Sequence, residues 1–233
     1  MEEYTGRVMK KAGMVVAVEM AALKRRYGEP AEVYHDGIYT VMRYEVGGYE
    51  LFVLSSGAGE IAAAAGTQHL ITKYGVELIL NYGLVGALTE EMSEKKICIV
   101  KAVCHYPFDL SEIDHVEKGR YTEFPDRYIE TSRELREEAL QIYPDLPEVL
   151  CASGDRFVGN ERDKRALHEE FGADICEMEA AGIILTCVRN GIPVMSVKMV
   201  SDSVHGGAEE FYRTFEEASD VCVDVLDHIL RGE

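Results

Sequence analysis

Short apolar runs alternate with helical patterns along this chain, and this alternation constrains the fold more than any other feature of the sequence. The runs at 13–18, 76–80, 97–103 and 194–200 are mostly apolar, as strands are when both faces of their sheet are covered. The Ala-rich stretch 60–74 between two of these runs has a high helix propensity. The pattern predicts a three-layer α/β/α fold around a central mixed, largely parallel sheet.

The chain of 233 residues is long enough to bury a sizeable core. It contains no internal repeat, low-complexity tract or obvious linker, so we expect a single domain over residues 1–233. Two strands at 39–44 and 49–54 are expected to form a hairpin around Gly47-Gly48. The polar stretch 111–125 is long for a structureless connection, which is typical of a lid or an interface arm.

The net charge of -18 restricts the partners of the protein. Such an acidic surface repels nucleic-acid backbones and anionic membranes, so neither is an expected partner. A neutral or cationic small molecule remains the favoured ligand.

The cysteines indicate the cellular compartment of the protein, and the histidines bear on whether it binds a metal. No two cysteines are spaced as Cys-x-x-Cys, and most lie in apolar runs, as reduced core cysteines do. No apolar run reaches the ~18 residues needed to span a bilayer. We therefore expect a cytoplasmic protein. The histidines show no metal-ligand spacing, so we expect neither a metal nor another cofactor.

Three short polar clusters interrupt the apolar C-terminal third, each where an expected strand ends. They are Ser153 to Phe157, Glu177 to Gly182, and Ser201-Asp202. Open α/β sheets bind ligands at the carboxyl ends of their strands. Carboxylates in an enclosed pocket suit acid catalysis and sugar recognition, which singles out Glu179 and Asp202.

Each of these residues also has a structural alternative. Glu179 starts an apolar helix, and the alternative is that it simply complements the helix dipole. For Asp202, the alternative is that it simply caps a helix or a turn. Phe157 could stack on a planar base or fill the core. Two expected glycine loops, 57–59 and 81–86, lack the dinucleotide-binding and Walker spacings, so they either pack tightly or let a ligand approach the backbone.

The three clusters together resemble the purine nucleoside phosphorylase and nucleosidase superfamily. The motifs are Ser153-Gly154-Asp155-x-Phe157, Glu177-Met178-Glu179-Ala180 and Ser201-Asp202. The stretches 56–59 and 81–88 precede them in the expected order, so the resemblance covers nearly the whole chain. Within the superfamily, it is strongest to the 5'-methylthioadenosine/S-adenosylhomocysteine nucleosidases.

The resemblance implies cleavage of an N-glycosidic bond. Asp202 would be the general acid that protonates the leaving purine, since burial raises a carboxyl pKa. Glu179 would accept hydrogen bonds from the ribose hydroxyls and favour an oxocarbenium-like sugar. The implied substrate-binding residues are Phe157, Val158, Met178, Glu177, Ser201, Gly83, Gly86 and Ala58. The resemblance also implies a homodimer or a larger homo-oligomer, in which the loop at 105–124 closes a neighbour's pocket.

The sequence departs from the nucleosidase pattern on the side of the nucleophile. Ala21 aligns with the glutamate that activates water in nucleosidases, and Glu19, two residues earlier, is expected to face elsewhere on the helix. Leu84 replaces a small hydroxyl residue, and Lys198 replaces an arginine. The arginines that a phosphorylase needs for phosphate are absent at the expected places, where Asn81 stands for one of them. Hydrolysis is therefore the leading interpretation, and phosphorolysis or nucleoside binding without catalysis are the alternatives.

Overall fold

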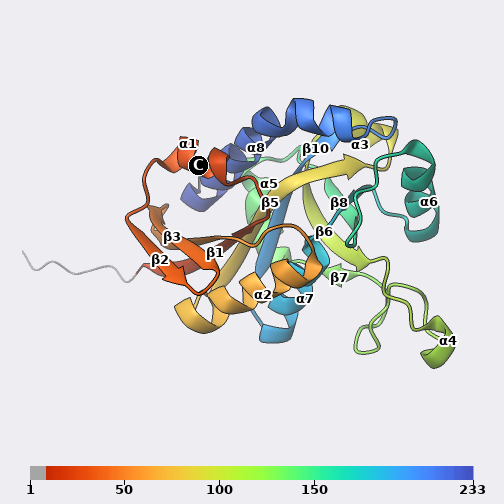
Figure 1. The fold of residues 1–233 in the computed structure, drawn as a ribbon, viewed down its shortest axis with the longest axis horizontal. Coiled ribbons are helices and arrows are strands. Elements are labelled where there is room, and N and C mark those ends of the chain that lie inside the picture. The colour runs from red at the N-terminus through yellow and green to blue at the C-terminus, as the bar shows by residue number, and fades with distance from the viewer. Residues whose placement is uncertain (1–8, 233) are drawn as a thin grey trace, which may run out of the picture.

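The computed structural model describes residues 9–232, in which helices cover both faces of a twisted β-sheet (Figure 1). The strands are β1 (Lys10–Val16), β2 (Glu32–Asp36), β3 (Tyr39–Val46), β4 (Tyr49–Ser55), β5 (Leu78–Ala87), β6 (Ile97–His105), β7 (Ile129–Glu130), β8 (Glu148–Ser153), β9 (Ile175–Glu177) and β10 (Val194–Asp202). The helices are α1 (Met20–Tyr27), α2 (Glu60–His69) with its π-helical continuation η1 (Leu70–Tyr74), α3 (Glu90–Lys95), α4 (Ser111–Asp114), α5 (Arg133–Ile142), α6 (Glu161–Phe171), α7 (Ala180–Asn190) and α8 (Ala208–Arg231).

Strand β5 is the centre of the sheet. On one side it pairs with β1, which leads through β4 and β3 to the edge strand β2. On the other side, β5, β10, β6, β8 and β9 pair in a closed ring. The pairs β1–β4, β1–β5, β5–β10, β6–β8 and β8–β9 are parallel, and the others are antiparallel. The expected mixed sheet and α/β class are confirmed.

The two helical layers bury separate parts of the core. Helices α2 and α7 pack on one face, where Ala63, Ile183 and Ile184 are buried against the sheet. Helices α1, α5 and α8 cover the opposite face, where Leu23 and Leu226 are fully buried. Continuous apolar strands need this double cover, because each of their faces must leave water.

The stretch 81–86 differs from its expected conformation. It is not a loop, because β5 continues through Gly83 and Gly86 to Ala87 and pairs with β10 along its length. A Cβ atom at Gly86 would lie 3.2 Å from both the Asp202 carboxylate and the Cys176 sulfur. The glycine therefore serves the close approach of neighbouring side chains rather than a turn.

The expected hairpin at Gly47-Gly48 is confirmed between the antiparallel strands β3 and β4. Both glycines have positive φ, of 58° and 85°, as a tight two-residue turn requires. A Cβ atom at Gly47 would overlap the carbonyl of Leu230, so this turn packs directly on the end of α8.

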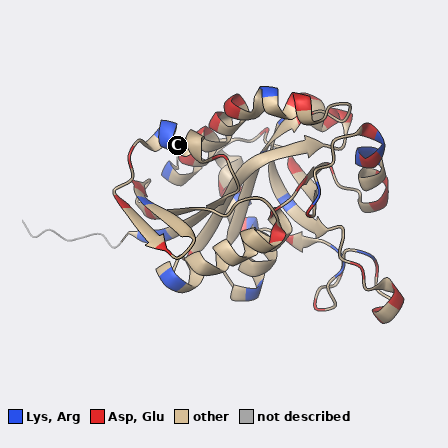
Figure 2. Ribbon diagram, viewed as in Figure 1, with Lys and Arg blue, Asp and Glu red and all other residues tan. Residues whose placement is uncertain are grey.

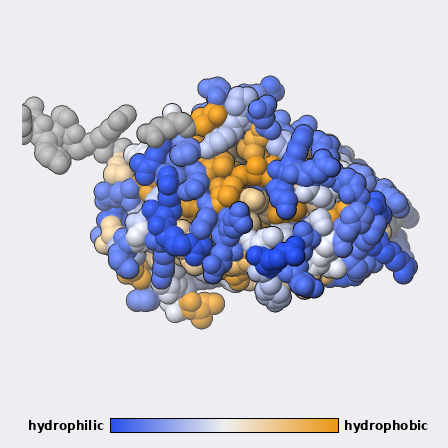
Figure 3. Space-filling view, turned by 90° about the horizontal axis from the view of Figure 1, so that it is seen from above, coloured by the Kyte–Doolittle hydropathy of each residue, from blue (hydrophilic) through white to orange (hydrophobic). Residues whose placement is uncertain are grey.

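The surface is acidic and mostly hydrophilic. Figure 2 shows Asp and Glu along the outside of α8, and Figure 3 shows an apolar area bordered by hydrophilic side chains on the face seen from above. Within residues 9–232, no helix has both the length and the apolar character needed to cross a membrane.

Candidate active site

One pocket lies where the carboxyl ends of β5, β9 and β10 meet the turns that follow β1 and β4. Its cavity volume is about 130 Å³, and the pocket opens to solvent. The lining residues are Ala17, Val18, Glu19, Ala58, Leu84, Val85, Gly86, Arg156, Phe157, Val158, Cys176, Glu177, Met178, Glu179, Ser201, Asp202 and Phe211. All three polar clusters of the sequence thus contribute to a single pocket.

Asp202, at the end of β10, is only 1% exposed. Its Oδ1 lies 2.8 Å from Ser201 Oγ, and its Oδ2 accepts a hydrogen bond of 2.5 Å from Lys164 Nζ. Burial raises the pKa of this carboxyl, and Lys164 partly opposes the increase. A carboxyl group with a raised pKa and a fixed orientation is suited to general acid catalysis.

Glu179 lies at the N-cap of α7 and lines the same pocket. Its Oε1 accepts a hydrogen bond of 2.8 Å from the backbone N–H of Gly59, in the loop after β4. Burial and the nearby charge of Glu177 raise the pKa of Glu179 to about 7. Asp202 and Glu179 therefore line one cavity.

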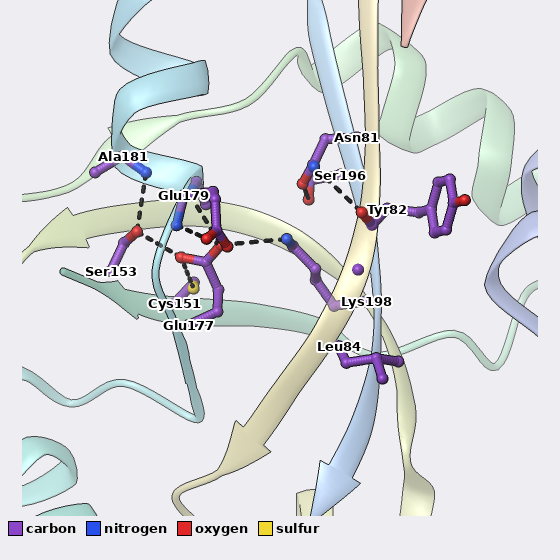
Figure 4. A network of polar contacts seen from close by, with 12 residues as sticks. Asn81, Tyr82, Leu84, Cys151, Ser153, Glu177, Glu179, Ala181, Ser196 and Lys198 are labelled. Carbon is purple, nitrogen blue, oxygen red and sulfur yellow. Dashed lines mark hydrogen bonds and ion pairs between the residues drawn. The ribbon is translucent and has the colours of Figure 1, made fainter. Parts of the chain in front are cut away.

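Glu177 organises the polar network between the strands and α7 (Figure 4). Its Oε2 accepts hydrogen bonds from the backbone N–H groups of Glu179 and Ala180, at 3.0 and 2.9 Å. The same oxygen forms an ion pair of 3.2 Å with Lys198, and Oε1 accepts from Ser153 Oγ. Glu177 thus binds the backbone at the start of α7, where Glu179 lies.

The position of Glu19 contradicts the expectation that it faces away from the site. Glu19 is 5% exposed and lines the pocket, with its carboxylate 3.0 Å from the N–H of Val18 and 3.3 Å from the N–H of Leu84. The expectation treated Glu19 as part of the helix, but α1 begins at Met20 and Glu19 precedes it. Ala21, the aligned position, is exposed on α1.

The other expected ligand-binding residues are placed as follows. Phe157, Val158, Met178, Ser201, Ala58 and Gly86 all line the pocket. Phe157 is 45% exposed and makes an edge-to-face contact with Phe211, at a ring distance of 5.8 Å. Gly83 is not a lining residue: it is buried in β5, where an added Cβ would lie 3.4 Å from Glu19 Oε1 and Lys198 Nζ.

Three residues of the site were not anticipated from the sequence. Lys164 binds Asp202 from α6, and Glu60 hydrogen-bonds Ser153 next to Glu177. Phe211, in the first turns of α8, lines the pocket. An isolated lysine, glutamate or phenylalanine in an amphipathic helix carries no sequence signal, because its role depends on the packing of that helix.

The cations near the pocket are mostly bound to carboxylates. Lys198 is 2% exposed and is paired with Glu177. Burial alone would lower the pKa of Lys198, but the negative charges around it have the larger effect, so its pKa is raised above the ordinary value. Arg156 is the only basic residue among the lining residues, and it is exposed and paired with Asp163. No group of three or more His, Cys, Asp or Glu side chains suited to a metal ion occurs within residues 9–232.

A family model described as the phosphorylase superfamily matches residues 12–231. The chain belongs to this superfamily. The match confirms the resemblance deduced from the three polar clusters.

Curated relatives of this superfamily member include two kinds of nucleosidase. A 5'-methylthioadenosine/S-adenosylhomocysteine nucleosidase of Staphylococcus aureus is 29% identical over 210 residues, which are 87% of this chain and 90% of the relative. An aminodeoxyfutalosine nucleosidase of Helicobacter pylori is 29% identical over 191 residues, 80% of this chain and 79% of the relative.

A solved structure supports the same relationship. The Helicobacter pylori 5'-methylthioadenosine/S-adenosylhomocysteine nucleosidase with butyl-thio-DADMe-Immucillin-A aligns with a TM-score of 0.89 and 26% identity. The alignment covers 96% of this chain and 99% of that one.

Proposed function

We propose that this phosphorylase-superfamily protein hydrolyses the N-glycosidic bond of a purine nucleoside of the 5'-methylthioadenosine or S-adenosylhomocysteine kind. The observation that carries the proposal is the meeting of Asp202, Glu179 and Glu19 in one pocket. These three carboxyl groups reach the pocket from three separate segments of the chain, and their surroundings differ. Such a pocket can supply an acid, a sugar-binding group and a base at once.

In this mechanism, Asp202 donates its proton to a ring nitrogen of the purine as the bond from the anomeric carbon to the base breaks. Phe157 stacks on the base, and the backbone of Val158 reads its edge. Met178 packs against the ribose. Glu179, when ionised, accepts hydrogen bonds from the ribose hydroxyls and stabilises the positive charge that develops on the sugar.

Glu19 is the proposed base for the attacking water. Its carboxylate is buried in the pocket and is oriented by two backbone N–H groups, so it can take a proton as the water oxygen bonds to the anomeric carbon. From the sequence alone no residue could be given this role, because Ala21 stands at the position that aligns with the water-activating glutamate.

The arrangement favours water over phosphate as the nucleophile. Phosphate binding needs several free positive donors. Arg156 is exposed and paired, and Lys198 is paired with Glu177. Base release from 5'-methylthioadenosine, measured with and without phosphate, tests the proposal. Equal rates support hydrolysis, strict dependence on phosphate supports the phosphorylase alternative, and binding without release of adenine supports the non-catalytic alternative.

We also propose that the protein is a cytoplasmic homodimer. A groove between α2 and α7 is lined by Ile61, Leu185, His105 and Tyr121, and the Ile61 side chain is 83% exposed. Burial of such an apolar side chain against a second copy would remove it from water. All six cysteines are free and buried, which agrees with a reducing compartment.

A further inference from the structure

Lys164 is a fully buried cation that the proposed reaction does not use directly. It lies in α6, most of whose side chains are exposed, and its own exposure is 0%. Lysine is rarely buried completely unless its ammonium group is paired. Its partner is Asp202 Oδ2, at 2.5 Å.

The ammonium group also binds the chain that follows Asp202. Lys164 Nζ donates to the carbonyl of Ser203 at 2.6 Å and lies 3.2 Å from the carbonyl of Gly206. These residues form the connection from β10 to α8, which brings Phe211 into the pocket. One side chain therefore fixes both the carboxyl group and the connection beside it.

The Asp202 carboxylate is held at both oxygens. Ser201 occupies Oδ1 and Lys164 occupies Oδ2, so rotation about the side-chain bonds would break a contact on either side. The oxygens cannot turn away from the pocket without losing a buried, charge-assisted hydrogen bond.

We propose that Lys164 is the positioning residue of the general acid. Its ammonium group orients the Asp202 carboxyl group and places a positive charge beside it. The inference rests on the function proposed above. Lys164 does not line the pocket, so its effect on the substrate is exerted through Asp202.

The charged and titratable groups around Asp202 come from three elements. Lys164 faces it from α6, Cys176 from β9 and Glu210 from α8. Lys164 favours the ionised carboxylate, whereas burial and Glu210 favour the protonated acid. Lys164 is the only cation in this group, so after its removal only the smaller effect of the Ser201 hydrogen bond opposes protonation.

A purely structural ion pair is the competing explanation. Buried ion pairs often contribute little net stability, because desolvation of both charges offsets their attraction. A structural role would lower stability and activity at all pH values alike. A positioning role would also move the pH at which activity is lost, and the two roles can therefore be separated.

The test is the pH dependence of kcat for adenine release from 5'-methylthioadenosine, measured for the wild type, Lys164→Met, Lys164→Gln and Lys164→Arg. Asp202 works in its protonated form, so activity declines as the pH rises through its pKa. Loss of the neighbouring cation raises that pKa, and we expect the alkaline limb to move up by about one pH unit or more in the Met and Gln variants. Lys164→Arg should keep the limb near its wild-type position.

Arg165→Met is the matched control, because it removes the exposed cation next in the same helix and leaves the buried pair intact. Its alkaline limb should not move. Gln is included because its amide can still donate to the Ser203 and Gly206 carbonyls if the Met variant is unstable. Circular dichroism and thermal melting establish which variants are folded.

The inference would be overturned if a folded Met or Gln variant kept its alkaline limb at the wild-type pH. It would also be overturned if both variants were unfolded, because Lys164 would then have a structural role. Failure of the wild type to release adenine would be a different result. It would refute the proposed function itself and leave no general acid for Lys164 to position.

Discussion

At the scale of single residues, the pocket gives similar carboxyl groups different surroundings. Asp202 is buried beside the hydroxyl group of Ser201 and the ammonium group of Lys164. Glu179 accepts a hydrogen bond from one backbone N–H group, and Glu19 accepts hydrogen bonds from two. The proposed mechanism uses Asp202 in its protonated form and Glu179 in its ionised form, which their different surroundings would allow.

The substitution Asp202→Asn removes the donated proton but keeps the size of the side chain. We expect kcat to fall by about 10²–10⁴-fold, because this is the usual contribution of a general acid. Steady-state kinetics on 5'-methylthioadenosine measure the effect, with a thermal melt to show that the variant is folded. An Asn variant with wild-type kcat would rule out the acid role of Asp202.

The substitution Glu19→Gln tests the base for water. We expect kcat to fall by about 10²-fold or more with little change in binding of the purine, because Gln cannot accept the proton. A second variant that adds Ala21→Glu should not restore activity, since position 21 is exposed on α1. Recovery of activity in the double variant would instead support the alignment and place the base at position 21.

At the scale of elements, the junction of α2, β8, β9 and α7 concentrates buried acids. Glu60 at the start of α2 hydrogen-bonds the Ser153 hydroxyl and the N–H of Gly182, and Ser153 also binds Glu177. Burial and the charge of Glu177 raise the pKa of Glu60 to about 8. The folded protein therefore keeps Glu60 protonated at pH values where an ordinary carboxyl group is ionised.

This junction should make stability depend on pH. Between the ordinary carboxyl pKa of about 4.5 and the folded value of about 8, the folded state binds more protons than the unfolded state. The free energy of unfolding should therefore fall as the pH rises through this window. Urea unfolding of Glu60→Gln should show a shallower decline, because Gln is neutral throughout.

Glu91→Gln is the control for this experiment, because its side chain is 69% exposed on α3. Its stability curve should run parallel to that of the wild type. Parallel curves for Glu60→Gln and the wild type would contradict the protonation of Glu60 in the folded state.

Most helices and strands could be predicted from the sequence, because the burial of their faces gives each element a characteristic spacing of apolar residues. The helix 60–74 and the hairpin at Gly47-Gly48 follow from local propensity alone. Strand β2 was missed because it lies at the edge of the sheet and is largely exposed, so its sequence Glu-Val-Tyr-His-Asp has no apolar face. The continuation of β5 through Gly83 and Gly86 was missed because glycine in a strand has the same local signal as glycine in a turn.

The site was predicted where its residues follow one another in the chain. Phe157, Glu179 and Asp202 belong to short motifs, and the structure brings all three to one pocket. Glu19 was misplaced because its direction depends on the residue at which α1 begins, and such boundaries are uncertain from sequence by a residue or two. Lys164 and Glu60 act across long sequence separations, which a single sequence does not reveal.

At the scale of the whole molecule, the exposed apolar side chain of Ile61 on α2 is the feature that the proposed dimer would bury. Light scattering should give a mass of about 52 kDa for the wild type, twice the 26.0 kDa of one chain. We expect Ile61→Glu to shift the mass toward one chain, because a buried carboxylate in an apolar contact is costly.

Ile38→Glu is the matched control, since Ile38 lies between β2 and β3 and is 93% exposed. This variant should keep the mass of the wild type. A wild-type mass of one chain, or no change in Ile61→Glu, would contradict a dimer through α2.

The contact of Gly47 with the end of α8 has a practical consequence. Helix α8 begins beside the pocket and runs for 24 residues, about 36 Å, before it meets the β3–β4 turn. A tether attached past Gly232 would therefore hold the protein by the end remote from the opening. Immobilised in this way on a sensor chip, the molecule should still admit a nucleoside freely.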